Sequence, residues 1–341
     1  MGILDWFINR PSQFDPDHLS DELTLRAIDK AVSLTNPRLK FVDAYRERLT
    51  PAVETSIHYL RSIIRSLPPP IPVSSSRWSS VSELRAFFAS ASDIPLALGR
   101  SSNLRTLLEK FPELEEAHLI LGMSYSEQRV LGMSLQGDVV QREVVQRVVS
   151  FSNHQARICG HSDAEVRRLL GTQAFEYLVA QALSEIGAER SERKDLETKR
   201  ALIRSRLRLF QQHGPGLGTV FGSAPAEPAE QIALEAQLME NERQLEALGS
   251  PQSSLEKELE CLCEVLLHPE NYVCIEPKML RLSTMNVVMD AEEIGSAAKV
   301  SFSLANLKGV PQVQQAFVIA RFPRDQLPSP KSGLEAAERY L

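Results

Sequence analysis

Residues 189–208 read ERSERKDLETKRALIRSRLR, and residues 227–264 read EPAEQIALEAQLMENERQLEALGSPQSSLEKELECLCE. The first stretch holds eight basic and four acidic residues, and the second holds ten acidic and two basic residues. Both carry apolar residues at steps of three and four, the periodicity of an amphipathic helix. We therefore expect two helical arms of opposite charge that pair as an antiparallel helical hairpin, a coiled coil, over residues 162–268.

The register of this hairpin follows from its apolar positions. In an antiparallel pair, facing residue numbers have a constant sum, and that sum is 441 for Ile186 with Leu255 and for Leu196 with Leu245. A shift of one arm along the other by three, four or seven residues would also place apolar residues opposite one another. The pattern therefore determines the antiparallel orientation of the arms better than their register. Gly187 in one arm and residues 248–251 (Leu-Gly-Ser-Pro) in the other interrupt helix formation at one level. They predict a hinge in the hairpin, and the alternative is two independent positions that each lower helix stability locally.

The segments on either side of the hairpin have the character of β-strands. Residues 121–125 (LGMSY) and 131–135 (LGMSL) are near copies whose apolar residues alternate, as in a half-buried strand. Residues 139–149 fit a strand or a helix capped by Asp138, and we favour the strand as part of a β-meander. After the hairpin, we expect strands at residues 272–276, 279–289, 299–304 and 313–322. Glu276-Pro277 and residues 306–311 supply the turns between them.

The N-terminal part has helical patterns. Asn36 and Pro37 are a suitable N-cap and first residue for an amphipathic helix that runs to Leu67. Pro51 predicts a kink or two abutting helices with Thr50 as the cap. Residues 68–76 predict a stiff Pro-rich connector, and PxxP recognition is the alternative. Ser80 and Glu83 predict a capping box for a helix through Phe87 and Phe88.

Together these patterns predict an α+β protein. Its parts are a helical N-terminal region with the connector, a small and mainly antiparallel sheet, an inserted long antiparallel helical hairpin, and a Pro-rich tail with a short helix. The sheet is split between the segments before and after the hairpin, and two separate β-pieces are the alternative. The predicted boundaries are 1–112, 113–161, 162–268, 269–325 and 326–341.

Composition excludes several classes. The formal net charge is −6, which gives no global reason for nucleic-acid binding. Arg200, Arg204, Arg206 and Arg208 could form a nucleic-acid stripe, but the acidic second arm explains them better. The sequence has no membrane-spanning stretch or signal peptide, and Trp6 and Phe7 are expected to dock on the protein rather than on a membrane. Four cysteines are too few for a disulfide framework, which favours the cytoplasm.

Motifs for catalysis are missing: the sequence has no P-loop, no GxSxG and no HExxH. Residues 213–218 (HGPGLG) resemble a phosphate loop in their glycines alone and predict a hairpin tip. Two loose clusters contain metal-ligand residue types: Cys261, Cys263, His268 and Cys274, and also His154, Cys159 and His161. Cys261 and Cys263 would point to opposite sides of a helix, so we expect packing rather than a metal, and no cofactor.

Two functions remain. The first is a non-catalytic scaffold or adaptor that uses the helical stalk for self-association or for binding a protein partner. The alternative is an enzyme or nucleotide-responsive regulator with a site in the β-body, near His154, His161 or Cys274. A concave polar pocket in the β-body would favour the alternative.

Overall fold

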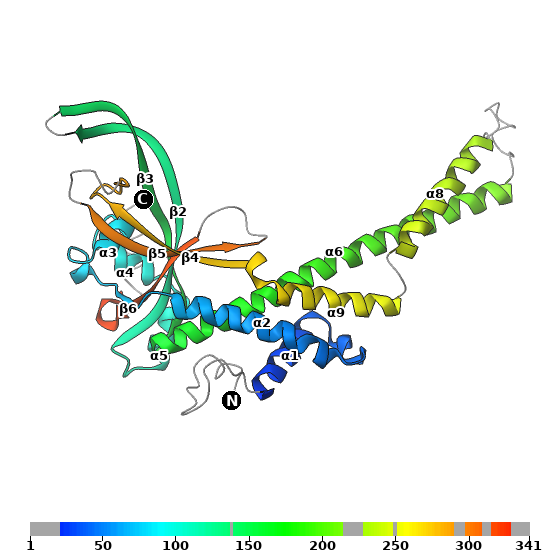
Figure 1. Ribbon diagram of the computed structural model, residues 1–341, viewed down its shortest axis with the longest axis horizontal. Helices are drawn as coiled ribbons and strands as arrows, with labels where there is room; N and C mark the ends of the chain where they lie inside the picture. The colour runs from blue at the N-terminus through cyan, green and yellow to red at the C-terminus, as the bar shows by residue number, and fades with distance from the viewer. Residues whose placement is uncertain are drawn as a thin grey trace. The chain divides into compact units, whose positions relative to one another are not determined.

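The computed structural model describes residues 21–136, 139–213, 228–247, 251–289, 297–308 and 315–328 (Figure 1). The described chain forms two compact units. Unit 1 comprises residues 21–23, 55–176 and 268–328, and unit 2 comprises residues 24–54 and 177–267. Boundaries between the units fall inside three helices, at residues 23/24, 54/55 and 176/177, and each unit is described by itself.

Unit 1 contains a curled, mainly antiparallel sheet, so the α+β class is confirmed. Its described strands lie in the order β3-β2-β6-β5-β4, and β1 adds to β6 in parallel. The bounds are β1 Ile71–Pro72, β2 Glu116–Gln136, β3 Val139–Gly160, β4 Val273–Leu282, β5 Ala298–Leu307 and β6 Gln315–Pro323. Strands from before and after residues 162–268 thus share one sheet. The strand prediction for residues 139–149 is confirmed.

Strands β2 and β3 form a long hairpin in which the irregularities lie on β3. Gly132 pairs with Val144 but Met133 pairs with Arg142, so Glu143 is an extra residue, and its φ is 63°. A similar shift accompanies Asn153, whose φ is 53°. Such bulges bend one strand and leave the phase of its partner unchanged.

The two copies of the LGMS repeat therefore present their leucines in the same phase of β2. Leu121, in the first copy, is fully buried, whereas Leu131, in the second, is 71% exposed. The difference arises because β6 pairs with β2 only from Glu116 to Ser124. Beyond that point β2 and β3 continue as a β-ribbon, with an isolated bridge from Val148 of β3 to Val287 near its base (Figure 1).

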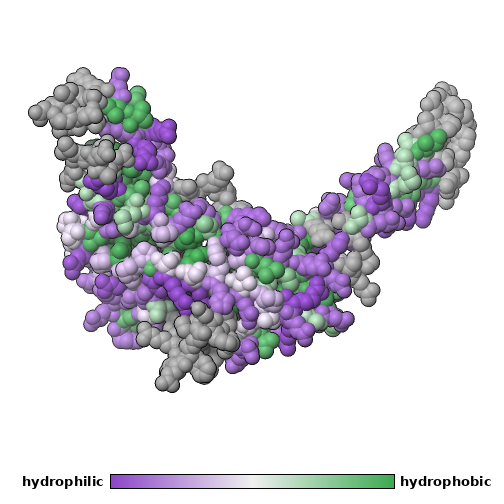
Figure 2. All heavy atoms as spheres, in the orientation of Figure 1, coloured by the Kyte–Doolittle hydropathy of each residue, from purple (hydrophilic) through white to green (hydrophobic). Residues whose placement is uncertain are grey.

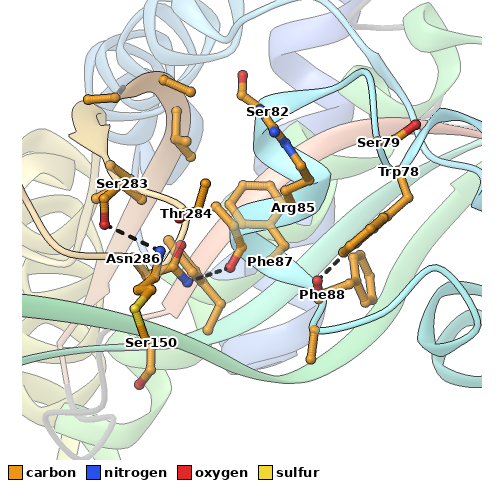
Figure 3. A pocket seen from close by; sticks show the side chains of 18 residues that line it. Trp78, Ser79, Ser82, Arg85, Phe87, Phe88, Ser150, Ser283, Thr284 and Asn286 are labelled. Atoms are coloured by element: carbon orange, nitrogen blue, oxygen red, sulfur yellow. Dashed lines mark hydrogen bonds between the residues drawn. The ribbon is translucent and has the colours of Figure 1, made fainter. Parts of the chain in front are cut away.

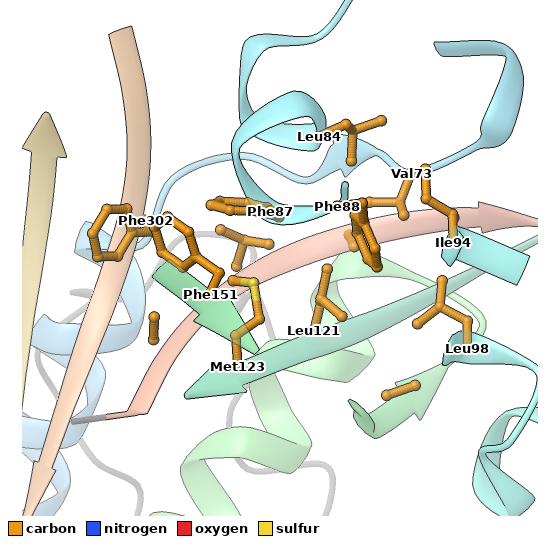
Figure 4. Packing of buried hydrophobic residues seen from close by; sticks show 14 of the residues in the cluster. Val73, Leu84, Phe87, Phe88, Ile94, Leu98, Leu121, Met123, Phe151 and Phe302 are labelled. Carbon is orange, nitrogen blue, oxygen red and sulfur yellow. The ribbon is translucent and has the colours of Figure 1, made fainter. Parts of the chain in front are cut away.

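Three short helices pack on one face of the sheet: α3 Ser82–Phe87, α4 Asp93–Leu98 and α5 Ser102–Lys110. We call this sheet with α3, α4 and α5 the β-body. Its core includes Leu84, Ile94 and Leu98 from the helices and Met123 from the sheet (Figure 4). The ring centroid of Phe151 lies 4.8 Å from that of Phe87 and 5.2 Å from that of Phe302, both edge-to-face. The opposite face buries Ile120, Ile319 and Val166.

Several local predictions were wrong for identifiable reasons. The Ser80 hydroxyl donates to the Arg77 carbonyl at 3.1 Å, so α3 begins at Ser82 without a side-chain cap. Glu276-Pro277 is not a turn, because β4 continues through Pro277. Since β4 is the last strand in the sheet order, a proline without an N–H can be accommodated there.

The Pro-rich connector was also predicted incompletely. Ile71 and Pro72 form β1 within the sheet, and the 3₁₀ helix η3 (Ser75–Arg77) follows. Two further 3₁₀ helices, η4 (Pro269–Asn271) and η5 (Arg324–Gln326), flank β4 and β6 in the sequence. The predicted tail helix and the hairpin tip at residues 213–218 lie wholly or almost wholly outside the described residues.

The described helices outside the β-body are α1 Asp21–Thr35, η2 Pro37–Phe41, α2 Tyr45–Ser66, α6 Asp163–His213, α8 Pro228–Ala247 and α9 Pro251–Leu267. Asn36 is an N-cap, since its side chain accepts from the Arg38 N–H at 3.0 Å, but the helix that it caps is η2 and not the predicted helix to Leu67, because α2 begins only at Tyr45. The prediction of two helices abutting at Pro51 was wrong. α2 runs through Pro51, and the Thr50 hydroxyl bonds back to the Arg46 carbonyl instead of capping.

Helix α6 is one element of 51 residues that continues through Gly187. The acidic arm consists of two helices, α8 and α9, as the interruption at residues 248–251 predicts, and α9 begins at Pro251. Of the apolar residues predicted to face the partner, Leu196, Leu234 and Leu245 are buried, but Ile232 is 63% exposed. The coiled-coil hairpin and its hinge therefore stay predictions.

Candidate functional site

A cavity of about 750 Å³ lies in unit 1 (Figure 3). It is bounded by α3 and the residues that flank it, by β3, by the turn after β4 and by the start of β5. Its polar and aromatic lining includes Trp78, Ser79, Ser82, Arg85, Phe87, Phe88, Ser150, Ser283, Thr284 and Asn286. The β-body thus has the concave, partly polar pocket that would favour a site there.

Asn286 fixes one wall of this cavity. Its side-chain amide donates to the Ala86 backbone carbonyl at 2.9 Å, and its backbone carbonyl accepts from the Val149 N–H at 3.0 Å. Its φ of 58° lies in the left-handed region, which asparagine tolerates better than most residues. Asn286 therefore joins the turn after β4 to both α3 and β3.

His154, His161 and Cys274, the three residues predicted near a β-body site, do not line the cavity. His154 contacts a residue that does. Its ring stacks on that of Phe88 with centroids 4.4 Å apart, and Phe88 is in the wall. Burial lowers the pKa of His154, and its Nε2 atom has no hydrogen-bond partner in the described structure. A neutral ring packed on an aromatic ring is a structural role for His154.

His161 lies just before α6, and Cys159 lies at the end of β3. Ser162 accepts from the Glu165 N–H at 3.2 Å, and Glu165 accepts from the His161 N–H at 2.7 Å. This is a variant of the capping box, because Glu165 accepts from the residue before the cap Ser162 and not from Ser162 itself. It also brings the His161 ring within 3.2 Å of the Glu165 carboxylate. Cys159 is in β3, where burial raises its pKa to about 12. A thiol held in its protonated form is a poor nucleophile and a poor metal ligand.

The second group of metal-ligand residue types is dispersed. The Cys261 Sγ lies 3.9 Å from a Glu185 carboxylate oxygen, whereas the Cys263 Sγ lies 3.7 Å from the Arg48 carbonyl. In unit 1, His268 pairs with Glu270 at 3.4 Å, and the Cys274 thiol contacts Glu276 at 3.6 Å. None of the four cysteines is in a disulfide.

Across the described ranges, no group of three or more His, Cys, Asp and Glu side chains is placed to hold a metal ion. The two predicted clusters therefore do not form one site there.

Another polar cluster, which the sequence did not indicate, lies at the base of the β-ribbon. The Lys278 ammonium donates to the Tyr125 hydroxyl at 2.9 Å, and that hydroxyl donates to Glu127 at 2.8 Å. Arg147 pairs with Glu127 at 3.3 Å. Burial and the neighbouring carboxylate raise the pKa of Tyr125, so its phenol stays protonated and is not a general base.

In unit 2, polar contacts join α6 to α8. The Arg204 guanidinium donates to Glu242 at 2.6 Å, and the Asn241 amide donates to the Leu196 carbonyl at 3.1 Å. Residues 196–204 of α6 therefore lie opposite residues 241–242 of α8. This arrangement brings Leu202, which is 54% exposed, to the level of Met239, which is 73% exposed.

Hydrophobic side chains are visible at the surface along α6 and α8 (Figure 2). Arg204 in the suggested nucleic-acid stripe is paired with Glu242. Among the described contacts, Arg200, Arg206 and Arg208 have no acidic partner.

No protein-family model, curated protein or solved structure matches this chain. In the part of the chain that the structure describes, none of the helices is both long enough and apolar enough to span a bilayer.

The residues that converge on the cavity were missed by the sequence analysis. Trp78 gave the clearest signal, as one of two tryptophans in the chain, within a serine-rich stretch. Arg85 and Asn286 gave none, because 200 residues separate the Asn286 amide from the Ala86 carbonyl that it binds.

Proposed function

We propose that the protein is a non-catalytic scaffold whose helices α6, α8 and α9 form an antiparallel coiled-coil hairpin that binds a second copy of the chain. The observation that carries the proposal is the exposure of Leu202 and Met239 at one level of the α6–α8 pair. Burial of a large apolar side chain contributes about 1.5–3 kcal/mol. In a twofold interface both protomers use the same surface, so Leu202 and Met239 would each be buried once in each protomer.

Charge complementarity supports a second copy as the occupant. The exposed cations Arg206 and Arg208 of α6 lack described partners, as do the exposed acids Glu246 of α8 and Glu256 of α9. An antiparallel second copy brings the acidic helices of one protomer to the basic helix of the other. Such pairs contribute little to affinity, but they select the partner and its orientation.

Light scattering after size-exclusion chromatography tests the proposal on the full chain. We expect the wild type to have the mass of two chains at about 50 µM. A binding free energy of about −8 kcal/mol corresponds to a Kd near 1 µM, which is well below that concentration. Leu202→Asp with Met239→Asp should give the mass of one chain. Phe41→Ser is the matched control, because Phe41 is 83% exposed on η2 and lies outside this surface.

A charge test separates this interface from unspecific apolar contact. Arg206→Glu with Arg208→Glu should weaken the dimer at low salt, and mixing this variant with Glu246→Arg and Glu256→Arg should restore it. A wild type of one-chain mass at all concentrations would refute self-association.

A ligand-responsive regulator with a site in the β-body is the second candidate. The cavity beside α3 favours it, because pockets of about 300–1,000 Å³ are typical of small-molecule sites.

A further inference from the structure

We propose that the cavity beside α3 binds a small amphipathic anion that has an aromatic body and one carboxylate, sulfonate or phosphate group. This inference deepens the second candidate function, the ligand-responsive regulator. It is independent of the proposed hairpin interface.

The walls of the cavity are fixed by hydrogen bonds before any ligand binds. The Trp78 indole N–H donates to the Phe88 carbonyl at 2.9 Å, and the Ser82 hydroxyl donates to the Lys299 carbonyl at 3.0 Å. Asn286 closes the opposite wall through Ala86 and Val149. A preformed pocket binds without the cost of ordering its own side chains.

The aromatic residues provide the surface for the apolar body. Trp78, Phe87 and Phe88 contribute to the lining from α3 and the residues around it (Figure 3). Phe87 is held in place by its edge-to-face contact with Phe151, which also lines the cavity. Phe87 and Phe88 are each only 2% exposed and form the buried backing of this wall, whereas Trp78 is half-buried and presents its ring to the cavity. An accessible indole ring favours a flat aromatic ligand, which can stack or pack edge-on.

The charge of the lining provides the selectivity for an anion. Arg85 is the one cationic residue that lines the cavity among the described residues, and no Asp or Glu lines it. The Arg85 side chain is exposed and makes no hydrogen bond or ion pair with another described residue, so its guanidinium can donate to a ligand. A guanidinium binds carboxylate, sulfonate or phosphate oxygens in a bidentate geometry.

Hydroxyl groups complete the polar side. Ser79 and Thr284 are exposed lining residues without a described hydrogen bond from their side chains. Each can donate to an anionic oxygen. A cavity with one free cation, free hydroxyls and aromatic walls matches a ligand that is apolar at one end and anionic at the other.

Two fluorescent probes that share one aromatic body test the proposal. 8-Anilino-1-naphthalenesulfonate is an anion, and N-phenyl-1-naphthylamine is its neutral counterpart. Titrated into the full chain, the anionic probe should bind with about one site per chain. The Arg85→Ala change should weaken it about five- to tenfold, since a charge-assisted hydrogen bond is lost. The neutral probe should be unaffected by Arg85→Ala.

Matched variants separate this cavity from other apolar surfaces. Arg77→Ala removes a nearby exposed cation that does not line the cavity and should leave both probes unchanged. Ala89→Trp places a large ring in the cavity mouth and should weaken both probes more than tenfold, while Ala89→Ser should not. Circular dichroism of Ala89→Trp verifies that the variant is folded.

Competition identifies the body of the ligand. Displacement of the anionic probe by 1-naphthaleneacetate at lower concentrations than by dodecanoate supports the aromatic body, whereas displacement by dodecanoate alone contradicts it. Displacement by neither overturns the proposal, as does equal binding of the anionic probe to wild type, Arg85→Ala and Ala89→Trp. Neither result alters the expected mass of the dimer, so the two proposals fail separately.

Discussion

Arg190 of α6 holds both carboxylate oxygens of Glu258 of α9, through Nε at 2.8 Å and through Nη2 at 2.7 Å. The Glu258 side chain is only 6% exposed, and the Asn36 amide donates to it at 2.7 Å as well. Asn36 also caps η2, so this carboxylate joins three segments of unit 2. A buried charge in such a place stabilises the fold only while its donors remain.

The first prediction concerns this pair. Arg190→Met removes two of the three described hydrogen bonds to the buried Glu258 carboxylate and leaves Asn36 as its described donor. We expect a loss of about 2–4 kcal/mol in the free energy of unfolding. Urea unfolding followed by circular dichroism measures it. In the double variant Arg190→Met with Glu258→Met, the loss should be smaller than the sum of the single losses.

Arg204→Met is the matched control on the same helix. Arg204 and Glu242 are 50% and 38% exposed, and an exposed pair contributes less than about 1 kcal/mol. Equal losses for Arg190→Met and Arg204→Met would mean that burial of Glu258 has no energetic consequence.

The second prediction concerns Arg167, which caps the C-terminal end of α2. Its guanidinium donates to the carbonyls of Ile64, Leu67 and Pro68 at 2.7, 3.1 and 2.8 Å, while Asp163 holds its Nε. Lysine cannot reproduce this planar fork. We expect Arg167→Lys to lower the free energy of unfolding by about 1–3 kcal/mol.

Thermal and urea unfolding of Arg167→Lys test this, with Arg100→Lys as the control. Arg100 is exposed and makes no described side-chain contact, so its change should stay within about 0.5 kcal/mol. An unchanged unfolding midpoint for Arg167→Lys would show that the hydrogen bonds from Arg167 to the three carbonyls make no net contribution to the free energy of unfolding.

Much of the architecture could be predicted because it is local. The three- and four-residue spacing of apolar residues predicted α6, and the alternation in residues 121–135 predicted β2. The errors occurred where tertiary structure decides. Pro277 can continue a strand only because β4 is at the edge of the sheet, and strand order is not visible in the sequence around it.

The candidate site was less predictable than the fold. Capping at Ser80 failed because α3 begins at Ser82, which leaves Val81 at the N-cap position, one residue later than the motif predicts. The Ser80 hydroxyl bonds back to the Arg77 carbonyl instead. The cavity depends on the convergence of α3, β3 and the turn after β4, which lie far apart in the sequence. Ligand-type residues such as Cys261 and Cys263 were visible in the sequence, but their side chains contact different helices.

The third prediction concerns metal content. Cys261 and Cys263 contact Glu185 and Arg48 respectively, and Cys159 has a pKa of about 12. Zinc binds thiolates and needs its ligands within one coordination sphere. We therefore expect elemental analysis of the purified full chain to give less than one zinc per chain. One equivalent of zinc that is lost in Cys261→Ser would contradict this, with Cys159→Ser as the comparison.

The fourth prediction concerns the pH dependence of stability. Burial lowers the pKa of His154 in the folded protein, whereas its unfolded pKa is about 6.5. Above about pH 7 the ring is neutral in both states, so His154 has no effect on the pH dependence there. As the pH falls through about 6.5, the unfolded chain takes up a proton that the folded chain resists, and stability decreases.

The melting temperature at pH 7 and at pH 5 tests this sign. Replacement of the ring in His154→Phe keeps the stacking on Phe88 but removes the titrating group, so the decrease between the two pH values should shrink. It should not vanish, because burial also lowers the pKa of His118 in β2. His58→Gln is the control for the loss of an imidazole at an exposed position on α2. A larger decrease in His154→Phe than in the wild type would mean that His154 is stabilised in its charged form, contrary to its buried position against Phe88.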